Sequence, residues 1–211
     1  MQEIEAGIFR SNPFELHAGG AKICSYILRR TDGNILVYGG GLFRDYKEEI
    51  RAIGGIRIQA ISHRHETTRY PDWVRMEFGA TRYCHKDELP AVPETFEIDV
   101  TFGKQLKIAP DFMAFHTPGH CPGSACFLWK RGAKTYAFTG DTLFMKDGAW
   151  GVDMANGDPR AAAGSLRSLV QHNFDVIVPG VYYDGLDALP VTPSQLATEL
   201  NPLLERLENA E

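Results

Sequence analysis

The chain contains few cysteines and no long hydrophobic run, and each absence restricts the class of protein. Its 211 residues include four cysteines, which are scattered without a paired spacing: Cys24, Cys84, Cys121 and Cys126. Thiols distributed in this way are typical of a reduced intracellular chain and not of a disulfide framework. No apolar segment approaches the roughly 20 residues that are needed to cross a bilayer. We therefore expect a cytoplasmic protein with no membrane association.

The N-terminal residues and the charge balance exclude further classes. Residues 1–5 contain neither the basic nor the apolar part of a secretory signal, so we expect no signal peptide. The net charge is −5 and the pI is near 5.8, whereas nucleic-acid binding requires clustered lysine and arginine. We expect a small-molecule substrate and no nucleic-acid partner, and the sequence leaves a homodimer open.

The remaining composition is that of an ordinary globular protein. Hydrophobic residues make up 44% of the chain and charged residues 23%, as in typical proteins with one packed core. The length is sufficient for one such core, and the sequence contains no internal repeat. The prediction is a single domain over residues 1–211.

Apolar runs in the first half predict strands that flank a helix. Ile23–Leu28 and Asn34–Tyr38 are separated by a segment that ends in Asp-Gly, a common hairpin signal. Apolar residues recur at helical spacing over Asp45–Ile53, and Ile56–Ile61 follows as a strand. A strand, a helix and a strand in this order predict a parallel crossover. Ligands in such sheets bind at the carboxyl ends of the strands.

The rest of the chain predicts more strands than helices. We expect strands over 81–85, 96–100, 105–108, 112–115, 125–129, 135–138 and 176–178, helices over 70–78, 158–172 and 193–207, and a loop over 88–94. Short turns between most of the later strands indicate antiparallel pairing. The predicted fold class is α/β (α+β): a four-layer αβ/βα sandwich in which two mixed β-sheets pack face to face with helices outside.

Side chains that can bind a metal follow three of these strands. His63 and His65 follow Ile56–Ile61, His120 ends the sequence Thr-Pro-Gly-His, and Asp141 ends Thr-Gly-Asp. Side chains at i and i+2 of an extended segment point the same way, so we expect His63 and His65 to converge. An isolated H-x-H pair is most often a pair of ordinary loop histidines. The two later motifs favour a metal site instead.

These motifs resemble those of the metallo-β-lactamase-fold hydrolase superfamily, which includes the glyoxalase II-like thioesterases. The superfamily pattern H-x-H-x-D-H corresponds here to the six residues 63–68, so that Thr67 and Thr68 replace an aspartate and a histidine. Val181 follows the Pro-Gly after which a last histidine is expected, and Tyr38 replaces the aspartate of L-I-D-x-G. The resemblance implies a complete first metal site and a degenerate second one.

The ligand set that the resemblance implies is His63, His65, His120 and Asp141. The expected cofactor is one zinc ion, with iron or manganese as alternatives. Three imidazoles and an open position suit a zinc ion that activates water. Asp141 is the residue assigned to catalysis, either as a fourth ligand or as the group that holds the metal-bound water. A direct carboxylate ligand would close the site, and closed zinc sites are usually structural. A backbone hydrogen bond in a tight turn is a further role open to Asp141.

Three functions remain open from the sequence. The first is a mononuclear metal-dependent hydrolase, in which metal-bound hydroxide attacks an ester, thioester, amide or phosphoester. The second is a catalytically degenerate member that binds a ligand or a protein. The third is a mononuclear iron oxygenase, which needs two histidines and one carboxylate. The identity of the metal separates the first from the third, and one fold hosts many chemistries.

Several neighbouring side chains receive an interpretation of their own. Glu66 and Glu77 are expected to be solvated carboxylates, with a role as a base as the alternative. His116 is a candidate for a hydrogen bond that orients a ligand. Cys121 adjoins His120, but neighbouring side chains on a turn diverge, so we do not expect it to bind the metal. The pair 182–183, both tyrosines, is expected in the core, with a pocket-lining role as the alternative.

Overall fold

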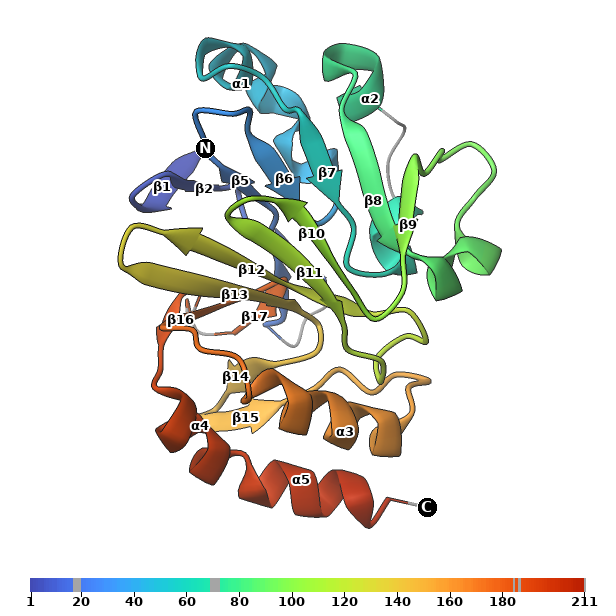
Figure 1. Ribbon diagram of the computed structural model, residues 1–211, viewed down its shortest axis with the longest axis vertical. Coiled ribbons are helices and arrows are strands. Elements are labelled where there is room, and N and C mark those ends of the chain that lie inside the picture. The colour runs from blue at the N-terminus through green and yellow to red at the C-terminus, as the bar shows by residue number, and fades with distance from the viewer. Residues whose placement is uncertain (17–19, 69–72, 184, 186, 211) are drawn as a thin grey trace. The chain divides into compact units, whose positions relative to one another are not determined.

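The computed structural model describes residues 1–16, 20–68, 73–183, 185 and 187–210 (Figure 1). The chain divides into two compact units, Met1–Phe102 and Gly103–Glu211. Each unit contains its own sheet and its own buried cluster of apolar side chains. Among the described residues, no helix is long and apolar enough to cross a membrane. The single domain expected over 1–211 stays a prediction.

The first unit contains a seven-stranded mixed sheet with the order β1-β2-β5-β6-β7-β8-β9. Its strands are β1 (Gln2–Glu5), β2 (Ile8–Arg10), β5 (Tyr26–Leu28), β6 (Ile35–Val37), β7 (Ile58–Ala60), β8 (Thr81–His85) and β9 (Val100–Phe102). The pairs from β1 to β6 are antiparallel, and those from β6 to β9 are parallel. A separate antiparallel pair joins β3 (Phe14–Glu15) and β4 (Lys22–Ile23).

Helices connect the parallel strands of this sheet. They are η1 (Gly41–Tyr46), α1 (Lys47–Ala52), η2 (Arg64–Thr67), α2 (Trp73–Phe78) and η3 (Lys86–Ala91). One core cluster joins the sheet to η1, α1 and α2, and it includes Ile27, Leu36, Phe43, Ile50, Trp73 and Val74. The parallel crossover predicted between 34–38 and 56–61 is therefore confirmed, and it leaves the carboxyl ends of β6, β7 and β8 at one edge.

The second unit contains a six-stranded mixed sheet with the order β10-β11-β12-β13-β16-β18. Its strands are β10 (Gln105–Ala109), β11 (Phe112–His116), β12 (Ala125–Arg131), β13 (Lys134–Gly140), β16 (Val176–Pro179) and β18 (Leu189–Pro190), and the short strands β14 (Phe144–Lys146), β15 (Ala149–Gly151) and β17 (Val181–Tyr182) lie outside it. Among the strands that the structure describes in this sheet, only β13 and β16 pair in parallel. The other pairs are antiparallel, as the short turns predict.

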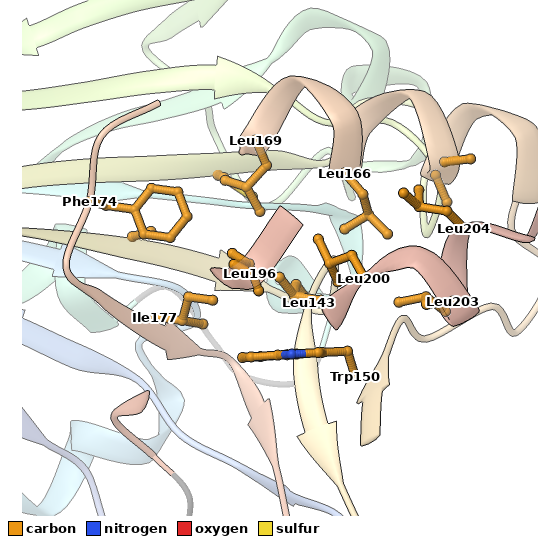
Figure 2. Packing of buried hydrophobic residues seen from close by; sticks show 14 of the residues in the cluster. Leu143, Trp150, Leu166, Leu169, Phe174, Ile177, Leu196, Leu200, Leu203 and Leu204 are labelled. Atoms are coloured by element: carbon orange, nitrogen blue, oxygen red, sulfur yellow. The ribbon is translucent and has the colours of Figure 1, made fainter. Parts of the chain in front are cut away.

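Three helices cover the core of the second unit: α3 (Pro159–Leu169), α4 (Pro193–Glu199) and α5 (Asn201–Glu208). Figure 2 shows Leu166 and Leu169 of α3 in the same apolar cluster as Leu203 and Leu204 of α5. Burial of leucine side chains of this kind contributes roughly 2 kcal/mol each. The Asp158 carboxylate accepts a hydrogen bond from the Ala161 N–H and caps α3.

Several predicted boundaries are wrong. The helix expected over 193–207 is two helices that meet at Leu200, because Pro202 has no N–H and is tolerated only in a first turn. Helix α3 ends at Leu169 and not at residue 172. The strand expected over 96–100 lies at β9, Val100–Phe102, and the loop over 88–94 includes part of η3. Residues 70–72 of the helix expected over 70–78 lie outside the described residues.

The predicted fold class is nevertheless confirmed. Both large sheets are mixed, and both units combine sheet with helix. Strands β1 and β2 and the β14–β15 hairpin were not predicted. They are only three or four residues long, and so short a run carries little periodic signal.

Candidate metal centre

Two of the histidines in the first unit, His63 and His65, follow the buried strand β7. His63 has an extended backbone (φ −161°, ψ 169°) and precedes η2, which begins at Arg64. His65 lies within this short helix and not in an extended segment, so the geometric reason given for convergence is wrong. The rings nevertheless contact each other edge to face, with centroids 5.0 Å apart and planes at 87°. The two imidazoles therefore come together through the tight turn of η2 and not through an extended strand.

A buried ion pair holds η2 in place. Glu88 in η3 is fully buried, and its Oε2 accepts hydrogen bonds from the Arg64 backbone N–H at 2.6 Å and from the Arg64 Nε at 2.8 Å. The Arg64 Nη2 donates to Oε1 at 3.0 Å. A guanidinium and a carboxylate paired in this forked way fix position as well as charge. The residue between the two histidines therefore anchors the turn that carries them.

The interior partners of His63 are Ser62 and Glu66. The Ser62 Oγ lies 2.8 Å from His63 Nδ1, and Glu66 Oε1 lies 3.5 Å from the same nitrogen. The Glu66 side chain is only 10% exposed, so the expectation of a solvated carboxylate is wrong for this residue. Glu77 is also paired, with Lys47 and Arg51, at 18% exposure. Glu66 was misjudged because no motif marks a carboxylate that folds back on its own turn.

The two threonines that replace family ligands use their hydroxyls within η2. Thr67 Oγ1 donates to the Arg64 carbonyl at 2.7 Å, and Thr68 Oγ1 donates to the His65 carbonyl at 3.1 Å. Tyr38, at another altered position, is buried, has φ 75° in the left-handed region and contacts the Tyr26 ring edge-on. Neutral hydroxyls are weak zinc ligands compared with a carboxylate or an imidazole. The described geometry at 67 and 68 therefore fits the degenerate second site.

In the second unit, a rigid turn after β11 carries His120. Gly119 has φ 148°, and a Cβ at this position would lie 2.6 Å from the Ala162 Cα of α3, so only glycine fits. The Ser165 hydroxyl donates to the Pro118 carbonyl at 2.6 Å, and the Asp158 N–H donates to the Gly119 carbonyl at 2.7 Å. The first turns of α3 thus fix the backbone from which His120 projects.

The His120 side chain is 2% exposed, and each of its two ring nitrogens faces an oxygen atom. Its Nδ1 lies 2.8 Å from the Asp153 carbonyl oxygen. A carbonyl only accepts, so in the neutral ring Nδ1 carries the proton and Nε2 carries the lone pair. Nε2 lies 3.5 Å from Asp141 Oδ2. An imidazole lone pair and a carboxylate that face each other in this way fit a cation between them, so the donor set fits a zinc-type metal ion.

Asp141 is placed by the end of β13. The β13–β16 ladder ends at Gly140, which has φ 54°, and Asp141 follows it. Burial raises the pKa of Asp141 to about 6; a proton on His120 Nε2 would act in the opposite direction, and the Asp153 charge raises the pKa further. Without a metal, a proton on Asp141 therefore neutralises part of the carboxylate charge that a bound cation would otherwise balance.

Asp153 is the residue at this centre that sequence reasoning missed. One ligand atom from each of His120, Asp141 and Asp153 can be chosen so that all three lie within 4.8 Å of one another. The Asp153 backbone is held by its N–H on the Asp141 carbonyl at 3.1 Å, and its Oδ1 accepts from the Ala155 N–H at 3.0 Å. Nothing but its acidic side chain distinguishes Asp153 in the sequence, because it follows the unpredicted strand β15.

The other residues singled out from the sequence lie as follows. His116 Nε2 lies 2.8 Å from the Pro122 carbonyl and so braces the turn that carries His120. Cys121 is buried, and the described cluster of potential ligands in its unit does not include it. The Tyr183 ring packs against Phe144 with centroids 5.6 Å apart. The side chain of Tyr182 lies outside the described part of the chain.

The chain matches a family model and is similar to a curated protein over part of its length. The model of the family described as "Metallo-beta-lactamase superfamily" matches residues 41–181. The curated "Uncharacterized protein YmaE" of Bacillus subtilis (strain 168) is 29% identical over 99 residues. That stretch is 46% of this chain and 36% of YmaE, so the match spans about a third of the relative's length.

Solved structures share the fold over nearly the whole chain. A metallo-beta-lactamase from Pontibacter korlensis is 15% identical with a TM-score of 0.76, covering 99% of this chain and 98% of its own. The metallo-beta-lactamase FIM-1 from Pseudomonas aeruginosa, in a mono-zinc form, is 16% identical with a TM-score of 0.72, covering 99% and 95%. TTHA1623, in a di-iron-bound form, is 20% identical with a TM-score of 0.67, covering 90% and 98%.

Proposed function

Because the chain belongs to the metallo-beta-lactamase superfamily, we propose that it is a metal-dependent hydrolase with one metal ion bound by His63, His65, His120 and Asp141. The observation that carries the proposal is the facing pair in the second unit, His120 Nε2 and Asp141 Oδ2 at 3.5 Å. The hydroxyls of Thr67 and Thr68, which donate to backbone carbonyls, support a mononuclear site.

The chain's own residues would divide the work as follows. When bound, a zinc ion in such a site lowers the pKa of a water ligand to about 7 and so supplies a nucleophile at neutral pH. His120 presents Nε2 because the Asp153 carbonyl holds Nδ1–H. Asp141 contributes the negative charge of the site, and it must lose its proton to do so, since its pKa is raised to about 6. Arg64 and Glu88 keep the turn that carries His63 and His65 fixed.

The substrate class that we propose is a small molecule with an ester, thioester, amide or phosphoester bond. Iron is the alternative metal, because two histidines and a carboxylate also suit iron, and the similar TTHA1623 structure holds two irons. Iron bound in place of zinc would support an oxygenase and not a hydrolase.

Metal analysis of protein purified without an affinity tag tests the proposal. We expect about one zinc per chain, lost in both His63→Ala and His120→Ala and retained in His172→Ala, whose imidazole packs on Phe115. Two ions per chain, of which each variant loses one, would show that the two units bind metal separately. No metal, even after incubation with zinc, would contradict the proposal.

Turnover is then measured with the zinc-loaded protein. A panel of ester, thioester, amide and phosphoester substrates identifies the bond cleaved, and the same variants should lose kcat/KM in step with their metal content. Ligand binding without turnover on any of these bonds would support the binding-module alternative.

A further inference from the structure

Glu66 receives both hydrogen-bond donors of a single residue, Ser62. The Ser62 backbone N–H donates to Glu66 Oε2 at 2.9 Å, and the Ser62 hydroxyl donates to Glu66 Oε1. Ser62 is 1% exposed, and the Glu66 side chain is 10% exposed. The direction of these bonds is therefore fixed in a nearly dry environment, where a carboxylate accepts and does not donate.

This arrangement fixes the proton of His63. A serine hydroxyl has one hydrogen, and Glu66 takes it, so the Ser62 Oγ can only accept from its other neighbour. That neighbour is His63 Nδ1 at 2.8 Å. The imidazole must therefore carry its proton on Nδ1 and its lone pair on Nε2.

We propose that Glu66 is a positioning residue: acting through Ser62, it holds His63 as the Nδ1–H tautomer and so reserves Nε2 for the metal. The second part of this inference rests on the proposed function, whereas the tautomer does not. Partners that orient a metal-binding histidine usually contact the ring directly. Here Glu66 Oε1 lies 3.5 Å from His63 Nδ1, and the shorter contact, at 2.8 Å, is made by the hydroxyl of Ser62, which precedes the histidine.

The same role is performed in the second unit by a different group. The Asp153 carbonyl accepts from His120 Nδ1 at 2.8 Å and gives that ring the same tautomer. His120 needs no carboxylate for this purpose, because a carbonyl cannot reverse its role. The Ser62 hydroxyl can either donate or accept, so Glu66 is needed to fix the direction of its hydrogen bond with His63.

The Glu66→Gln variant separates positioning from simple support of the turn. If the amide oxygen of the introduced glutamine keeps the Ser62 N–H, its amide N–H₂ faces the Ser62 hydroxyl and donates to it. The hydroxyl then turns its hydrogen to His63 Nδ1, and the ring proton moves to Nε2. A residue that merely supports the turn would be replaced by the isosteric glutamine without consequence.

The experiment is ¹⁵N NMR of the histidine rings in the metal-free protein, together with zinc affinity by chelator competition. It is performed at about pH 8, well above the ordinary imidazole pKa of about 6.5. Wild type should show Nδ1–H for both His63 and His120. In Glu66→Gln we expect His63 alone to change to Nε2–H, with zinc affinity about 10- to 100-fold lower.

Matched variants identify the path. Ser62→Ala should also release the His63 tautomer, and Ser62→Thr, which restores a hydroxyl, should return both the tautomer and the affinity. Glu77→Gln is the control, since Glu77 is a similarly buried carboxylate in the same unit that pairs with Lys47 and Arg51. It should behave like wild type.

An Nε2–H ring at His63 in wild type, or an unchanged His63 spectrum in Glu66→Gln, would overturn the inference even if zinc binds. A ring that switches as expected in a protein that binds no zinc would support the positioning by Glu66 and contradict the proposed function. Unchanged signals from His120 in the second unit and from the buried His85 in the first show that both units are intact in each variant.

Discussion

Arg64, the residue between two candidate metal ligands, places its guanidinium and its backbone N–H on the fully buried carboxylate of Glu88. The position of His63 and His65 therefore depends on an ion pair with η3, some two dozen residues further along the chain.

Removal of one partner of this pair should be costly. In Arg64→Ala, Glu88 would keep a buried charge without its cation, and we expect the free energy of unfolding to fall by about 3 kcal/mol. This is the lower end for a buried pair, because the Arg64 side chain is 25% exposed. Urea unfolding of the metal-free protein measures the effect.

Arg51→Ala provides the matched control. Arg51 pairs with Glu48 and Glu77 at 48% exposure, and exposed pairs contribute about 1 kcal/mol or less. Equal losses in the two variants would mean that the Arg64 pair is no more than a surface contact.

The protonation of Asp141 should make the metal-free protein sensitive to pH. The pKa of Asp141 is raised from 3.8 to about 6, chiefly by burial. The stability that the bound proton contributes is complete below the unfolded value and is lost as the pH rises through about 6. Asp141→Asn imitates the protonated form. At about pH 8 we expect it to be more stable than wild type by on the order of 2 kcal/mol.

The measurement is urea unfolding in the presence of a chelator over a pH series. The difference between Asp141→Asn and wild type should shrink toward zero as the pH approaches 3.8. Asp153→Asn should move the transition to lower pH, since the Asp153 charge raises the Asp141 pKa. A gap that is the same at every pH would show that another group is responsible.

Thr67 and Thr68 should be dispensable for metal binding. Their hydroxyls donate to the Arg64 and His65 carbonyls, so the Thr67→Val and Thr68→Val variants should keep the metal content of wild type. Each should lose about 1 kcal/mol of stability with its hydrogen bond. Metal analysis and thermal unfolding check both parts, and loss of metal in a fully folded variant would make a threonine a ligand.

Gly119 should not tolerate a side chain. In Gly119→Ala the new Cβ would lie 2.6 Å from the Ala162 Cα, on a backbone with φ 148°. We expect a loss of about 3 kcal/mol or more from overpacking and backbone strain together. The turn that carries His120 should shift with it, so metal affinity should fall as well.

Gly164→Ala is the control for this substitution. Gly164 lies within α3, and a Cβ added there would have no neighbouring atom within 4 Å. Alanine is favoured over glycine in a helix by about 1 kcal/mol, so we expect a small gain in thermal stability. A loss in Gly164→Ala equal to that in Gly119→Ala would contradict the steric argument.

The sequence determined the class of fold and most of the groups that matter, because these depend on local patterns. Apolar runs marked the longer strands, and the chain order of strand, helix and strand predicted the parallel crossover that is observed. The motifs at His120 and Asp141 predicted two side chains that do lie together, since they follow β11 and β13, which lie on either side of β12 in one sheet. Pro202, which divides the last helix, is a signal that the sequence does contain, but the regular leucine spacing around it predicts one continuous helix.

Tertiary structure alone decided how these groups are held. His65 lies in a short helix whose position is fixed by the ion pair between Arg64 and Glu88. No local sequence pattern indicates a partner so far along the chain. Asp153 contacts His120 through its backbone carbonyl oxygen. Every residue has this group, so the sequence does not mark the contact. The Glu66 carboxylate turns inward because Ser62 offers it two donors. Hydrogen-bond direction is a property of atoms brought within about 3 Å, and folding, not residue spacing, sets those distances.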